Sequence, residues 1–188
     1  TNIGTFPVGS GGIMWQAIMD GDGNQQVALT GVVIGAEEDL DDPTNPDLLT
    51  ALSTNGGVAL TSNNWYGHTA PYFAWSGAAD TGSGVSGYYV YFGTDNSANP
   101  ETAGTLQSGT TYTAGSLVSG QTYYLKIATR DVAGNVSSPW DAFVYKLDTA
   151  ASINPGAVVV APAGYTQTKD FTFTWTAASD LGSGVAGY

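Results

Sequence analysis

The stretch FAWSGAADTGSGVSGY at residues 73–88 occurs a second time as FTWTAASDLGSGVAGY at residues 173–188. Around it, residues 55–88 align without a gap with residues 155–188, and twelve of the 34 pairs are identical. A chance match between glycine- and serine-rich segments would not also align Phe, Trp and Tyr. The chain therefore contains an internal repeat with an offset of 100 residues, which indicates an array of similar modules.

Alternating patterns inside the repeat predict β-strands. Residues 72–76 place Phe73 and Trp75 on one face, as expected of a half-buried strand. Glycine recurs every few residues and no 3.6-residue apolar stripe persists, so the sequence predicts an all-β fold. One stretch, Pro46 to Leu52, is helix-like. Further strands are predicted at residues 58–60, 88–92, 110–114, 123–129 and 142–146.

A period near 100 residues suits a seven-stranded sandwich, and three motifs make a resemblance specific. They are Trp75, the Gly-Tyr-x-Val-Tyr of residues 87–91, and the Leu-x-x-Gly-x-x-Tyr of residues 117–123. Together they resemble the fibronectin type III family, and the last resembles its tyrosine corner. The DVAGNVS segment at residues 131–137 is similar to the end of bacterial Ig-like surface repeats.

The resemblance implies fibronectin type III-like (Ig-like) β-sandwich repeats, of the kind found in large extracellular surface proteins. We expect one buried core, made of Phe73, Trp75, Tyr88, Val90, Leu117, Tyr123, Leu125 and Ile127. The expected organisation is a β-rich, hairpin-containing N-terminal segment with an acidic linker at 1–46, a complete sandwich at 47–148, and the start of a second, incomplete sandwich at 149–188.

Composition excludes several classes of function. Asp and Glu outnumber Lys and Arg by 16 to 4, and the net charge of −12 disfavours binding to nucleic acid or to an anionic membrane surface. No apolar run is long enough for membrane insertion. The chain has no cysteine, which is compatible with a large bacterial exterior protein that relies on its core. An extracellular or cell-surface location is expected from the modules themselves.

Catalytic constellations are not evident, and the sequence predicts that the protein is not an enzyme. His68 is the single histidine, it falls in a predicted loop, and no G-x-S-x-G elbow accompanies it. The acidic residues cluster in linkers and turns, where solvent keeps them ionised, rather than as the paired carboxyls of a glycosidase. No catalytic or cofactor-binding residue is assigned.

Calcium is the one ligand that the acidic loops suggest, because a hard cation prefers oxygen donors. Asp20, Asp22 and Asn24 have the opening spacing of an EF-hand loop, although Gln25 and Gly31 replace its glycine and glutamate. The second candidate set comes from sandwich topology, which places two loops at one pole, with the incoming linker and Asp47 close by. Its residues are Asp80, Asp131 and Asn135. In both sets the alternative is that the side chains only cap their own turns.

Aromatic residues supply the candidate partner-binding surfaces. Trp65 and Tyr66 lie in a predicted loop and could stack on carbohydrate, although aromatics of a sandwich are more often core. Phe171, Phe173 and Trp175 alternate with threonines and give the second module a strongly apolar face. We expect a continuing chain, or another chain by strand addition, to cover this face.

These observations favour a non-catalytic structural or adhesive segment of a large secreted or cell-surface repeat protein, such as a cell-wall, surface-layer or filament component. Its partners would be neighbouring repeats or other copies of the same protein. The alternative is an accessory spacer or carbohydrate-binding region of a secreted hydrolase. Fold alone does not separate the two, because function lies in sites carried by a fold.

Overall fold

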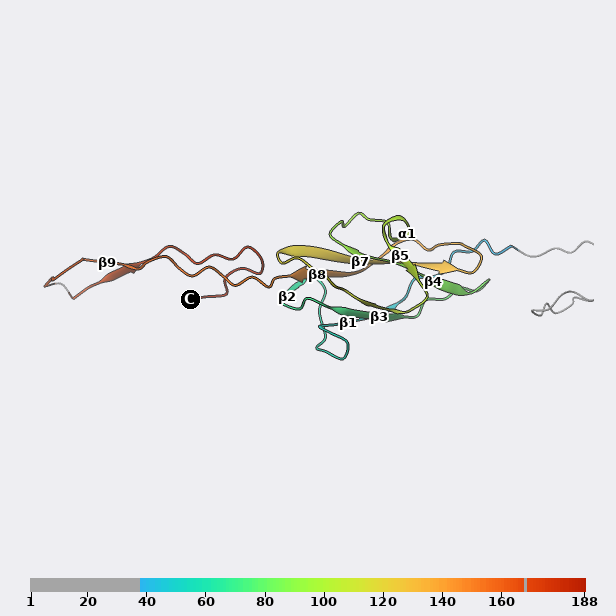
Figure 1. Ribbon diagram of the computed structural model, residues 1–188, viewed down its shortest axis with the longest axis horizontal. Coiled ribbons are helices and arrows are strands. Elements are labelled where there is room, and N and C mark those ends of the chain that lie inside the picture. The colour runs from blue at the N-terminus through green and yellow to red at the C-terminus, as the bar shows by residue number, and fades with distance from the viewer. Residues whose placement is uncertain (1–37, 168) are drawn as a thin grey trace, which may run out of the picture. The chain divides into compact units, whose positions relative to one another are not determined.

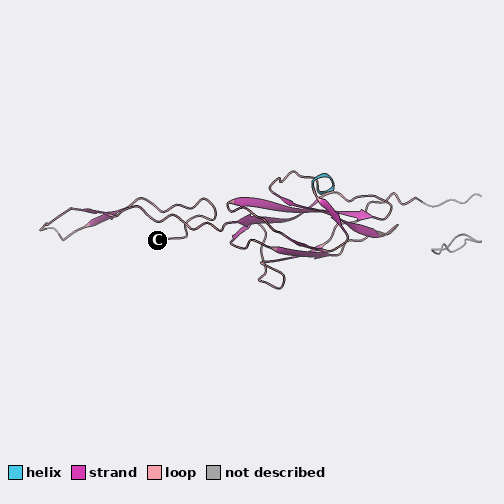
Figure 2. Ribbon diagram, viewed as in Figure 1, coloured by secondary structure: helices cyan, strands magenta, loops and turns pink. Residues whose placement is uncertain are grey.

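The computed structural model describes residues 38–167 and 169–188 (Figure 1). Within these ranges the chain forms ten strands and one four-residue helix, which confirms the predicted all-β fold (Figure 2). No helix in this part of the chain has the length and hydropathy of a membrane span. The predictions for Asp20, Asp22 and Asn24 fall outside the described residues.

Two sheets face each other in a β-sandwich, seen as two layers in Figure 1. The first sheet has the order β1-β3-β6 and is antiparallel throughout. Its strands are β1 (Leu48–Leu52), β3 (Tyr72–Ser76) and β6 (Thr111–Thr113). The second sheet has the order β2-β8-β7-β4-β5, and its pairs are antiparallel except that β2 runs parallel to β8. Its strands are β2 (Asn64–Tyr66), β4 (Val85–Gly93), β5 (Thr105–Gln107), β7 (Gln121–Asp131) and β8 (Trp140–Leu147). Helix α1 (Pro100–Ala103) precedes β5.

Aromatic side chains fill the space between the sheets. Phe73 of β3 is fully buried and contacts Phe92 and Phe143 of the opposite sheet, with ring centroids 5.5 and 5.4 Å apart. Trp75 packs edge-on against Tyr88 at 5.6 Å. Burial of these rings is the main stabilising contribution to the fold. Of the predicted core residues, seven are buried and Leu117 is partly buried against them.

Two local predictions were wrong. The helix-like stretch ending at Leu52 forms strand β1, because Leu49 and Ala51 alternate toward the core while β1 pairs with β3. Residues 58–60 do not form a strand, and Ala59 makes only an isolated bridge to Leu52. In both places strand pairing with a distant partner overrides the local pattern.

The tyrosine corner is present. The Tyr123 hydroxyl accepts a hydrogen bond from the Val118 backbone N–H at 2.6 Å and donates to the Val118 carbonyl at 3.4 Å. Gly120 has φ +80°, a conformation that favours glycine, and its N–H donates to the Leu147 carbonyl at 2.7 Å. The corner therefore connects the start of β7 to the end of β8.

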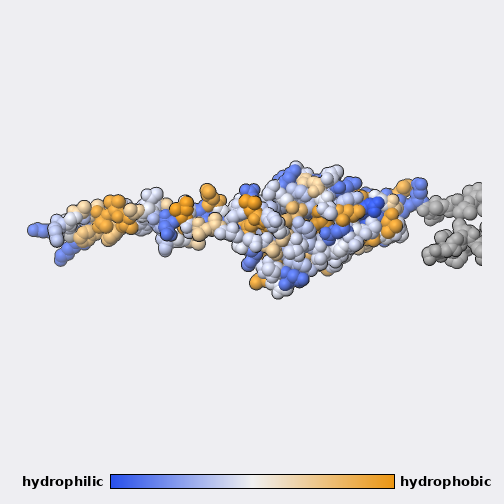
Figure 3. Space-filling view, in the orientation of Figure 1, coloured by the Kyte–Doolittle hydropathy of each residue, from blue (hydrophilic) through white to orange (hydrophobic). Residues whose placement is uncertain are grey.

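The second module contains a two-stranded hairpin, β9 (Val159–Ala161) with β10 (Thr172–Thr174). Apolar side chains gather on its surface in Figure 3, in agreement with the exposure of Val159, Phe173 and Trp175.

Backbone pairing corrects the ungapped repeat alignment. The Asp47 N–H donates to the Ser76 carbonyl, and the Gly156 N–H donates to the Thr176 carbonyl. Asp47 and Gly156 are therefore structurally equivalent, so Gly56 and Gly156 are not. The offset between equivalent residues is 109 at Asp47 and Gly156. It is 100 at their hydrogen-bonding partners, Ser76 and Thr176. The second module therefore has nine residues fewer between these two partners than the first module has.

Candidate functional site

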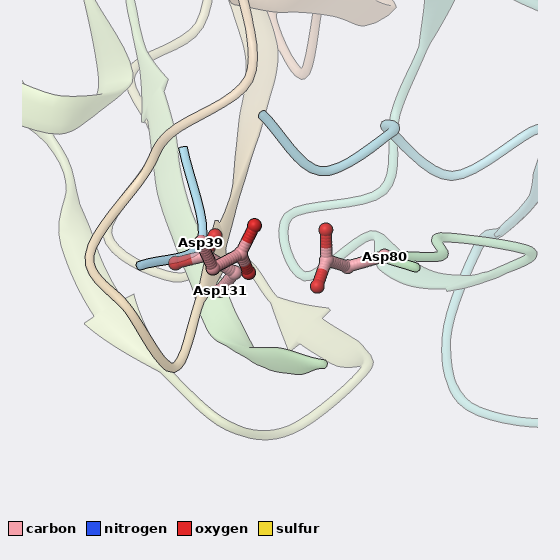
Figure 4. A group of neighbouring side chains, drawn as sticks. All are labelled: Asp39, Asp80 and Asp131. Atoms are coloured by element: carbon pink, nitrogen blue, oxygen red, sulfur yellow. The ribbon is translucent and has the colours of Figure 1, made fainter. Parts of the chain in front are cut away.

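Three carboxylates meet at one pole of the sandwich (Figure 4). Asp39 comes from the acidic linker, Asp80 from the loop after β3, and Asp131 from the end of β7. Each offers an oxygen, and these oxygens all lie within 4.8 Å of one another. The structure thus brings together Asp80 and Asp131, as sandwich topology predicted, and adds Asp39.

Asp131 is fully buried and satisfied by its own loop. Its carboxylate accepts hydrogen bonds from the N–H groups of Gly134 and Asn135 at 2.5 and 2.8 Å, and from the Asn135 side-chain amide at 2.7 Å. A buried carboxylate needs such donors, because an unpaired buried charge is very costly. The Asn135 side-chain amide also donates to the Asp39 carbonyl at 2.9 Å. Asn135, the third residue of the predicted set, therefore connects the loop after β7 to the acidic linker.

Asp80 holds the loop between β3 and β4. One of its carboxylate oxygens accepts hydrogen bonds from the N–H groups of Gly82 and Gly84, at 3.1 and 2.7 Å. Gly84 has φ +87°, so a side chain there would be strained. These bonds are the turn-capping interactions that the sequence offered as the alternative to a metal site. The two oxygens of a carboxylate together offer about four lone-pair sites, so the second Asp80 oxygen can ligate an ion while the first caps the turn.

Sequence reasoning missed Asp39, which the linker brings back onto the sandwich. Its carboxylate accepts hydrogen bonds from the N–H groups of Ser83 at 2.6 Å and Asp41 at 3.2 Å. Hydrogen bonds from Ser83 hold the pKa of Asp39 below its usual range. Asp47, which was expected near the pole, instead packs its carboxylate against Gly77. The signal that could have found Asp39 is its counterpart Asp148, 109 residues later.

The geometry suits a divalent cation. Calcium binds oxygen at about 2.3–2.6 Å, so two ligands on opposite sides of the ion are about 5 Å apart. Oxygens within 4.8 Å of one another fit such a shell. Among the described residues the one ion pair is Lys126 with Asp141, and no basic side chain pairs with the three aspartates. Their mutual repulsion is therefore not offset by a direct ion pair with a basic side chain of the described residues.

The aromatic candidates Trp65 and Tyr66 are half-buried in β2 rather than free in a loop. The Lys146 ammonium lies 5.9 Å from the centre of the Trp65 ring. Tyr66 stacks on Tyr145 with centroids 5.6 Å apart, and its hydroxyl accepts from the Thr61 N–H at 2.7 Å. Both rings therefore have partners within the module.

The single histidine shows no catalytic arrangement. His68 lies in an exposed loop, and its ring packs against Tyr66 with centroids 6.2 Å apart. Its carbonyl accepts a hydrogen bond from the Tyr145 hydroxyl. Burial raises the pKa of Tyr145 to about 12, so this hydroxyl remains a donor at neutral pH.

The apolar face of the second module is open. Phe171, Phe173 and Trp175 are 50, 58 and 48% exposed. Phe173 lies opposite Val160 across the hairpin, and Trp175 makes an edge contact with Tyr188 at 6.0 Å. The expectation that a partner or a continuing chain covers this face stays a prediction.

Comparison with known proteins finds a similar sequence within a larger protein. The chain is 30% identical over 167 residues to Exoglucanase B of Cellulomonas fimi. The similarity covers 86% of this chain and 14% of that protein, so the chain spans about one seventh of the relative's length. No protein-family model matches the chain, and no solved structure matches it. The similarity thus falls on a small part of that protein.

Proposed function

We propose that the chain is a non-catalytic segment of a large secreted or cell-surface repeat protein, with modules that act as spacers and lateral-contact surfaces. The observation that carries the proposal is the repeat itself. The linker aspartate, the loop aspartate and the strand between them recur, with Asp148 and Asp180 in the places of Asp39 and Asp80. Tandem copies of one sandwich extend a chain without requiring an active site.

The fibronectin type III-like character of the modules is part of this proposal. In its support, a three-stranded sheet faces a five-stranded one, Trp75 lies in the core, and Tyr123 forms a tyrosine corner. The extracellular location follows from the same resemblance.

An accessory role in a hydrolase is the second candidate, and the similarity to an exoglucanase favours it. That similarity covers a seventh of the relative, the size of a linker or accessory region rather than of the whole enzyme. In this version the modules hold a catalytic domain at a distance from its substrate, or bind the polysaccharide through aromatic residues such as Trp65.

Two assays on the purified chain test these proposals. Incubation with soluble and insoluble glucans should release no reducing sugar, and release would refute the non-catalytic assignment. Depletion of the chain by insoluble cellulose tests the carbohydrate-binding form of the second candidate. No depletion is expected of a spacer, whereas depletion that Trp65→Ala abolishes would establish a carbohydrate-binding role. Glu101→Ala, an exposed change in α1, serves as the control.

A divalent cation at the aspartate pole is the ligand proposed for this module. It rests on the distances among Asp39, Asp80 and Asp131 and on their lack of a basic partner in the described chain. A bound ion would tie the linker to two loops and raise the free energy of unfolding. Thermal melts in millimolar calcium and in chelator should differ by several degrees for the wild type and not for Asp80→Asn. Equal melts in both conditions would exclude the ion.

A further inference from the structure

The two linker aspartates have the same hydrogen-bonding pattern. Asp39 accepts from the N–H groups of Ser83 and Asp41, at 2.6 and 3.2 Å. Asp148 accepts from the N–H groups of Ser183 and Ala150, at 2.6 and 3.0 Å. The Ser183 hydroxyl adds a further bond to Asp148 at 2.7 Å. In each module the linker aspartate is therefore bonded to the loop that follows a strand, β3 in the first module and β10 in the second.

Backbone pairing extends each attachment along the chain. The Thr44 N–H donates to the Ala79 carbonyl at 2.8 Å. In the second module Ile153 and Ser179 exchange two backbone hydrogen bonds, of 2.7 and 3.2 Å. A segment held by a side-chain acceptor and by backbone pairing does not behave as a free tether.

Glycine makes room for each linker carboxylate. A Cβ atom at Gly82 would lie 2.4 Å from the Asp39 carboxyl group, and one at Gly182 would lie 2.4 Å from that of Asp148. Atoms do not approach so closely, so any side chain at these positions would displace the aspartate. The repeated Gly-Ser pair of the loop thus supplies both the space and the donor for the linker aspartate.

Asp148 also contacts the first module. Its N–H donates to the Tyr66 carbonyl at 2.9 Å, and its carboxylate lies 3.4 Å from the Ser119 hydroxyl. That hydroxyl oxygen accepts from the Thr149 N–H at 2.8 Å. Ser119 belongs to the corner that precedes β7. Asp148 is therefore bonded on one side to the first sandwich and on the other to the loop of the second.

We propose that Asp148 is the positioning residue of an interface between consecutive modules, in which the Ser119 corner of one module and the Gly182-Ser183 loop of the next are fixed by one linker carboxylate. The partner that fits the Ser119 corner is a second module of the same kind. This inference rests on the proposed spacer function and specifies it. The linker between consecutive modules is rigid, so the array is a stiff spacer rather than modules joined by flexible linkers.

Spin labels provide the test, because the chain has no native cysteine to interfere. Glu101→Cys in α1 and Ala163→Cys in the second module place a label at an exposed position on each side of the interface. Electron–electron dipolar spectroscopy on the whole chain should give one narrow distance distribution. Asp148→Ala should broaden it by about twofold or more, because the released linker samples many conformations. Ser183→Ala, which keeps the backbone N–H donor, should broaden it less.

Asp170→Ala is the control, since it removes one carboxylate from the same module and Asp170 makes no hydrogen bond among the described residues. It should leave the distribution narrow. The first sandwich should melt at the same temperature in every variant, because Asp148 follows the last residue of β8. A broad wild-type distribution, or an unchanged one in Asp148→Ala, overturns the proposal. Neither result affects the glucan assays, so the spacer function stands or falls separately.

Discussion

Residues 73–88 and 173–188 are identical at ten of 16 positions but have very different surroundings. Phe73 and Trp75 are 0 and 4% exposed, whereas Phe173 and Trp175 are 58 and 48% exposed. The Trp–Tyr edge contact is present in both copies, at 5.6 Å and 6.0 Å. So are the two backbone bonds accepted by the loop aspartate. Local contacts follow the local sequence, while burial depends on a second sheet that distant residues supply.

The largest expected difference between the copies concerns their tryptophans. Trp75→Ala should lower the free energy of unfolding by about 3–5 kcal/mol, because it empties an aromatic site in the core. Trp175→Ala should change it by less than about 1 kcal/mol, because that ring is half exposed. Urea denaturation followed by circular dichroism measures both. Similar losses for the two variants would mean that the second face is covered in solution.

Trp75→Phe sharpens the same comparison. The buried indole N–H of Trp75 has no hydrogen-bond partner among residues 38–167 and 169–188, so part of the tryptophan's burial is unfavourable. This variant keeps an aromatic ring and removes the unpaired donor. It should therefore destabilise the sandwich clearly less than Trp75→Ala does in the same denaturation experiment.

The tyrosine corner should have a smaller effect. Tyr123→Phe leaves the Val118 N–H without its acceptor and should lower the free energy of unfolding by about 0.5–1.5 kcal/mol. Tyr124→Phe is the matched control, because that half-exposed neighbour makes no hydroxyl bond within the described chain. Identical denaturation midpoints for the two variants would show that the corner bond contributes no net stability.

The aspartate turns should respond alike in both modules. Asp80→Ala and Asp180→Ala each remove the acceptor of two glycine N–H bonds, and the expected cost is about 0.5–1 kcal/mol for the turn. Hydrogen exchange at Gly84 and Gly184 should accelerate to a similar degree in the respective variants. Acceleration in one module alone would show that the turn depends on the surrounding sandwich.

The smallest effect is expected from acid. Hydrogen bonds from Ser183 lower the pKa of Asp148 from its usual 3.8 to about 2. A depressed pKa in the folded state means that the contact is fully stabilising above the usual value and is lost as pH falls through the lowered one. The Ser183 amide resonance should therefore stay constant down to about pH 3 and then shift with a midpoint near pH 2. A shift centred at the usual pKa of 3.8 would show that the hydrogen bonds from Ser183 to Asp148 do not form in solution.

Prediction from sequence succeeded where the pattern is local or topological. The strand with Phe73 and Trp75, the long strand around Tyr123 and the aspartate turns are all confirmed. Topology placed Asp80 beside Asp131 correctly. Prediction from sequence failed at residues 46–52. The leucine-rich stretch suggested a helical turn, but pairing with β3 makes it a strand.

The fold and the candidate site both combine features set by the local sequence with features set by contacts between distant residues. The sequence by itself determined the all-β fold, the repeat and the aspartate turns, because alternation, glycine placement and Asx hydrogen bonds act within a few residues of one another. Tertiary structure alone decided that Asp39 and not Asp47 joins the pole, that Asp47 corresponds to Gly156, and that one copy of the tryptophan is buried. Those outcomes depend on where a linker folds back and on which sheet covers a strand. Such contacts join residues far apart in the chain, and no local pattern records them.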